Sequence, residues 1–167
     1  MEGTRRATVG PAVPVGRVVA LVGALALLAA YAMPWLAVPV GNGQGITLSG
    51  LFLGRFLAGA DDLRRFMPGA RGGPAEVQQL RALVLLFPAA GVLAALLAAA
   101  TAFTARRALW NAALVVVGLV PLAALSVGLA QLPPGAGPEL GLWVIAAGAA
   151  GVVVGGVLDL VLSQRAG

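Results

Sequence analysis

Four apolar runs in the chain each reach the length of a membrane span. They cover about residues 18–38, 80–103, 108–130 and 140–162. A helix of about 20 residues rises about 30 Å, which matches the hydrocarbon core of a bilayer. The pattern therefore predicts an all-α membrane protein, with one domain over residues 1–167 built as a four-transmembrane-helix bundle.

The longest stretch without such a run is residues 39–79, which we expect to form a loop outside the membrane. It begins with a glycine-rich turn and a brief extended segment at 46–48. Ser49 then suits the N-cap of a helix over about 51–67. The apolar residues on one face of that helix are Phe52, Phe56, Leu63, Phe66 and Met67. This face is predicted to rest in lipid or to dock on protein, or else the helix is a solvated connection.

Prolines and aromatic residues mark where the apolar runs begin, end or bend. Pro34 is expected to stop or kink the end of the first span, where Tyr31 and Trp35 fit an interfacial aromatic belt. Pro74 suits the first residue of the second helix, and Pro88 should kink that helix.

Composition supports a membrane location. The chain is 60% hydrophobic and 10% charged, with a mean hydropathy of +0.97, whereas soluble domains are about 25% charged. The net charge of +5 comes from eleven arginines and no lysine. Such a charge alone would suggest nucleic acid, but the arginines lie at the edges of the apolar runs. We therefore expect membrane lipid and other membrane subunits as partners, and no nucleic acid.

The arginines also predict how the chain is threaded. The short turn between the second and third spans carries Arg106 and Arg107, whereas the turn at 131–139 carries no basic residue. Positive residues favour the cytoplasmic side. Both termini and the arginine turn are therefore expected in the cytoplasm, and the 39–79 loop outside, in a multi-pass protein of a bacterial inner (plasma) membrane.

The chain contains no cysteine and no histidine. This inventory excludes disulfides, thiol redox relays, iron–sulfur ligation, His-ligated haem and Ser–His catalysis. We expect no enzymatic activity, no cofactor and no metal.

Small residues recur at intervals of four in the last span, at Ala147, Gly151 and Gly155. This spacing places them on one helix face, where small side chains let two helices approach closely. The predicted contact is either within the chain or with a second copy or another partner.

Asp159 is the only acidic residue inside a span. An intramembrane carboxylate needs a partner, and the predicted one is Arg106 or Arg107, with help from Asn111. A structural ion pair is the main interpretation, and proton or ion transport is the alternative.

The Pro34-Trp35 pair, followed by a short extended segment and Ser49-Gly50-Leu51, resembles small bacterial four-span proteins of unassigned function. The large first outer loop is also similar to the plan of claudin-like tetraspan proteins, although this chain lacks their loop disulfide. The resemblance implies the four-span plan and no activity. The function we expect is that of a non-enzymatic accessory or structural subunit of a larger membrane complex, and the alternative is a small transporter or channel.

Overall fold

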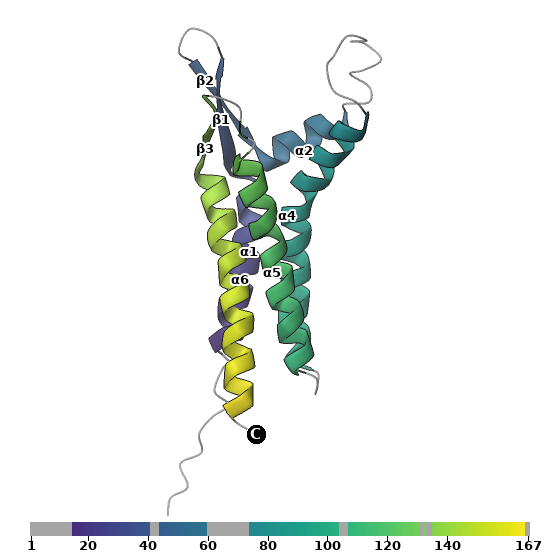
Figure 1. Cartoon of the computed structure of the whole chain (residues 1–167), viewed down its shortest axis with the longest axis vertical. Helices are drawn as coiled ribbons and strands as arrows, with labels where there is room; N and C mark the ends of the chain where they lie inside the picture. Colours follow the sequence, from purple (N-terminus) through teal and green to yellow (C-terminus); the bar gives the residue numbers. More distant parts are fainter. Residues whose placement is uncertain are drawn as a thin grey trace, which may run out of the picture.

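The computed structural model describes residues 15–40, 44–59, 74–103, 107–130, 132 and 135–165. Within these residues the chain forms five helices and three short strands (Figure 1). In chain order the elements are α1 (Val15–Ala30), β1 (Pro34–Val40), β2 (Gln44–Ser49), α2 (Gly50–Ala58), α4 (Pro74–Ala100), α5 (Arg107–Ala130), β3 (Gly137–Pro138) and α6 (Leu140–Arg165).

Three of the helices are long and apolar enough to cross a membrane. These segments are Gln78–Ala100 of α4, Arg107–Ala130 of α5 and Leu140–Ser163 of α6, and their mean hydropathy lies between 2.2 and 2.5. They coincide with the second, third and fourth predicted spans. α4 begins at Pro74, as the position of that proline predicts.

The first predicted span, residues 18–38, is wrong over residues 31–38. α1 ends at Ala30, and residues 31–33 form a tight turn whose N–H groups donate to the carbonyls three residues back. Pro34 then opens β1. Proline lacks an N–H and disfavours a helical backbone in the residue before it, so the helix ends although apolar residues continue. Its 16 residues rise about 24 Å, which is less than the hydrocarbon core.

An antiparallel sheet, which the sequence analysis did not predict, lies beyond one end of the long helices (Figure 1). Its strand order is β2-β1-β3, and Leu36 of β1 pairs with Leu48 of β2 and Pro138 of β3. The extended segment predicted at 46–48 is the middle of β2. The backbone N–H of Glu139 donates to the carbonyl of Trp35 at 2.8 Å. The sheet therefore ties the segment after α1 to the start of α6, and we name this end of the molecule the sheet end.

The predicted cap of α2 is confirmed, but α2 is short. The side chain of Ser49 accepts a hydrogen bond from the backbone N–H of Phe52 at 3.2 Å. This bond satisfies one of the free amides of the first turn. The helix ends at Ala58 instead of continuing through the predicted range of 51–67, and residues 60–73 lie outside the described part of the chain.

α1, α4, α5 and α6 lie side by side (Figure 1). α1 packs against α4 and α6, and α5 also packs against α4 and α6. α2 contacts the sheet end of α4. Leu27, Leu114, Ile145 and Val152 are fully buried, and most of the other core residues on the helices are alanines.

Candidate functional site

Glycines bring the backbones of α1 and α6 into direct contact. A methyl group on Gly23 would lie 2.5 Å from the carbonyl oxygen of Gly148. A methyl group on Gly155 would lie 2.5 Å from the backbone nitrogen of Ala20. Cβ atoms essentially never make contacts this short, so this approach depends on the missing side chains. We name these four residues the α1–α6 glycine contact.

The small-residue face predicted on the last span lies partly in this contact. Gly155 faces Ala20, and a methyl group on Gly151 would lie 3.3 Å from the Cα of Gly23. Ala147 is exposed, and the neighbouring Gly148 is buried against α1 instead. The reason is geometric, because residues four apart rotate about 40° per step around a helix. A contact that follows the helix axis therefore alternates steps of three and four.

Asp159 lies against the start of α1. A methyl group on Gly16 would lie 2.7 Å from the carboxyl carbon of Asp159. Gly16 is in the first turn of α1, where free backbone N–H groups favour a nearby negative charge. The predicted ion pair with Arg107 is not among the contacts of the described residues, and Arg106 lies outside them. The close α1–α6 packing carries Asp159 to the start of α1.

Arg17 joins the start of α1 to the end of α4, a contact that the sequence analysis missed. Its Nε donates to Oγ1 of Thr101 at 3.0 Å, and Nη2 donates to the Thr101 carbonyl at 3.3 Å. The Thr101 hydroxyl donates in turn to the Ala98 carbonyl at 2.7 Å. Arg17 thereby satisfies one of the carbonyls left free by the end of α4. The available signal was that the start of the first span and the end of the second span were both expected at the cytoplasmic end.

Buried polar side chains are scarce in the described residues. Thr101 and Asn111 are the two that are buried, and both lie at the end of the helices opposite the sheet. Oδ1 of Asn111 has no hydrogen-bond partner in the described structure. From this end to the sheet end, the described core is apolar.

An apolar pocket of about 400 Å³ lies at the sheet end under α2. Its walls come from β1, α2, α4, α5 and α6, and Leu132 adds to them. The lining residues are Trp35, Leu36, Leu53, Phe56, Leu57, Leu80, Leu83, Val84, Phe87, Ala124, Leu125, Gly128, Leu129, Leu132 and Leu142. A methyl group on Gly128 would meet nothing within 4 Å, so the pocket is open at this point of α5.

Trp35 is fixed in the wall of this pocket by a hydrogen bond and by close contacts of its ring. Its Nε1–H donates to the carbonyl of Ala30 at 2.7 Å, and its ring meets the ring of Phe87 edge to face at 5.3 Å. Gly50 and Gly141 lie so close to the indole that a methyl group on either would be 2.6 Å from a ring atom. Trp35 is only 4% exposed. It therefore packs inside the protein and does not join the interfacial belt predicted for it.

The aromatic face predicted on the outer helix is present for its first two members. Phe52 and Phe56 are exposed on α2 and stack with ring centroids 6.3 Å apart. Phe56 also forms part of the pocket wall. Leu63, Phe66 and Met67 lie outside the described residues.

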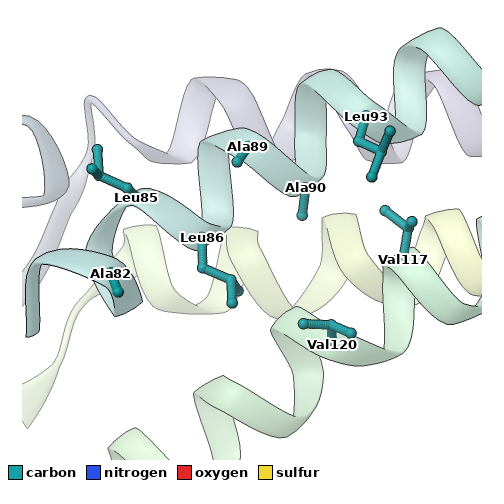
Figure 2. A pocket seen from close by; sticks show the side chains of 8 residues that line it. All are labelled: Ala82, Leu85, Leu86, Ala89, Ala90, Leu93, Val117 and Val120. Carbon is teal, nitrogen blue, oxygen red and sulfur yellow. The ribbon is translucent and has the colours of Figure 1, made fainter. Parts of the chain in front are cut away.

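A second apolar hollow of about 440 Å³ is a groove between α4 and α5. Figure 2 shows Leu86 and Leu93 of α4 pointing toward Val120 and Val117 of α5, with Ala90 between the two leucines. The other residues that line this α4–α5 groove are Ala82, Leu85 and Ala89. The groove is open to the outside along its length and offers no polar side chain.

The described residues offer two apolar hollows as binding surfaces. No group of three potential metal ligands comes together among the described residues. Comparisons with protein families, with curated proteins and with solved structures found no match to this chain.

Proposed function

We propose that the chain is a multi-pass membrane protein in which α1, α4, α5 and α6 cross the bilayer as a four-helix bundle. The sheet end lies outside, and both termini lie in the cytoplasm. Its role is that of a non-enzymatic accessory or structural subunit of a larger membrane complex in a bacterial plasma membrane. The short α1 fits this placement because a bilayer thins locally around a short helix.

The observation that carries the proposal is the apolar outer surface of the long helices. Large apolar side chains are exposed along three of them, including Leu93 on α4, Val116 on α5 and Val154 on α6. A soluble protein of this size rarely exposes a contiguous apolar surface this long. Lipid or another membrane protein is the natural cover for it.

The packed interior favours a subunit over the alternative of a transporter or channel. A transport path needs polar groups along the membrane depth. In the described core, the buried polar residues Thr101 and Asn111 lie at one end only. Asp159 lies at that same end against Gly16, which suits a structural role.

The α4–α5 groove supplies a surface for a partner helix. Ala89 and Ala90 lie between Leu86 and Leu93 (Figure 2), and helices in membranes associate where small residues permit close approach. The test is a photo-crosslinking amino acid at Ala89 in the native membrane, with Val154, exposed on α6, as the matched control. A discrete cross-linked polypeptide from position 89 and none from position 154 is expected. Lipid adducts alone from both positions would contradict the subunit role.

A further inference from the structure

We propose that the pocket at the sheet end holds one acyl chain of a membrane phospholipid whose phosphate is bound by Arg81. The proposal rests on the membrane placement proposed above. It adds a specific lipid site that the placement alone does not require.

The chemistry of the walls selects an apolar ligand. All the side chains that line the pocket are apolar, including Trp35, Phe87 and Leu125. A polar group placed there would lose its hydration without gaining a hydrogen bond. The volume of about 400 Å³ lies within the range of roughly 300–1,000 Å³ of ligand pockets. An acyl chain is the apolar ligand of suitable shape that a bilayer supplies in excess.

The mouth of the pocket connects it with the apolar surface of the protein. Phe56 of α2 and Leu80 of α4 line the pocket and are each 52% exposed. On α5, the exposed Val120 and Val127 lie on the same helix face as Ala124 of the pocket wall. A lipid chain therefore reaches the pocket along the apolar outer face of α5.

Arg81 is exposed on α4 and follows Leu80 of the pocket wall. At about 100° per residue, its side chain leaves the helix about 60° from that of Val84, the nearest lining residue around the helix axis. A guanidinium binds two oxygens of a phosphate at once. Arg55 is also exposed at this end, but the same geometry places it on the side of α2 away from the pocket walls. Arg55 is therefore a matched control for Arg81.

The fluorescence of Trp35 reports whether a lipid chain occupies the pocket. Bromine atoms on a lipid chain quench the fluorescence of a tryptophan that they contact, and Trp35 is too buried for bulk lipid to reach. A chain with W110F and W143F keeps Trp35 as its only tryptophan. A chain with W35F and W110F keeps Trp143, which is 60% exposed and reports on bulk lipid. Both are reconstituted in phosphatidylcholine vesicles with a rising fraction of dibrominated phosphatidylcholine.

We expect quenching of both tryptophans. G128L fills the pocket and should abolish quenching of Trp35, whereas S126L, which alters an exposed position of the same helix, should leave it unchanged. A124L is a second way to fill the pocket if G128L does not fold. An unquenched Trp35 beside a quenched Trp143 would overturn the lipid site, as would quenching that survives both filling variants. An unquenched Trp143 would overturn the membrane placement itself.

The phosphate contact is tested with dibrominated diacylglycerol, which carries the same chains without a phosphate. In the chain that keeps Trp35, the phospholipid should quench at a lower mole fraction than the diacylglycerol. R81Q should remove this difference, and R55Q should keep it. Equal quenching by the two lipids, or a difference that survives R81Q, would contradict the role of Arg81.

Discussion

Replacing Gly155 with alanine adds one methyl group where α1 and α6 touch backbone to backbone. The new Cβ would lie 2.5 Å from the backbone nitrogen of Ala20, whereas ordinary Cβ contacts begin at 3.4 Å. The two backbones must therefore move apart at this point. Because the obstacle is backbone, no side-chain rotation relieves the clash.

The substitution G128A is the matched control for G155A. A methyl group there meets nothing within 4 Å. Both variants exchange a helical glycine for alanine, which by itself favours the helix by about 1 kcal/mol. The difference between them isolates the cost of overpacking, which is about 1–3 kcal/mol. G155A should therefore be less stable than G128A by that amount.

The assay is unfolding in mixed micelles with increasing sodium dodecyl sulfate, followed by tryptophan fluorescence. The free energies of unfolding of the wild type, G155A and G128A are compared at one detergent composition. If the two variants agree within about 0.5 kcal/mol, the usual scatter between independent sites, the close approach of α1 and α6 is refuted.

Three further changes are measured in the same assay. R17Q removes two charged hydrogen bonds to Thr101 and should lower the free energy of unfolding by about 1.5–3 kcal/mol. T101V should then lower it much less in R17Q than in the wild type. If the effects of R17Q and T101V are additive, the contact is refuted. D159N removes the negative charge beside Gly16 in the first turn of α1 and should cost about 0.3–1 kcal/mol; a stabilised D159N would contradict the favourable placement of that charge. W35F removes the hydrogen bond from Trp35 to the carbonyl of Ala30 and should cost about 1 kcal/mol or more, so an unchanged stability would be evidence against the buried indole.

The three long helices were predictable because their apolar runs are bounded by polar residues or prolines. Arg107 begins α5, and Pro74 begins α4. The end of α1 was not predictable from hydropathy, because apolar residues continue from α1 into β1. What separates them is backbone chemistry at Pro34 and long-range pairing of β1 with β2 and β3. Such pairing leaves little trace in the local pattern of β1.

The sequence indicated that α6 has a close-packed face, but it did not indicate which helix packs against that face. Glycine spacing indicated a close-packed face on α6, and Gly155 lies in it. The spacing did not indicate that α1 is the neighbour, and the position of Asp159 follows from that neighbour. The contact of Arg17 with Thr101 joins residues 84 positions apart, so it depends on how the helices are arranged. The pocket escaped prediction for the same reason, because its walls come from five elements.

The central claim, that the helices cross a bilayer with the sheet end outside, is tested most directly by single-cysteine labelling. The natural chain has no cysteine, so each introduced thiol is unique. Thr47 on β2 and Ser163 near the end of α6 are both exposed, and they lie at opposite ends of the molecule. We predict that a membrane-impermeant maleimide labels T47C in intact cells and labels S163C only after the membrane is opened. Labelling of both positions in intact cells, or of S163C alone, would contradict the account.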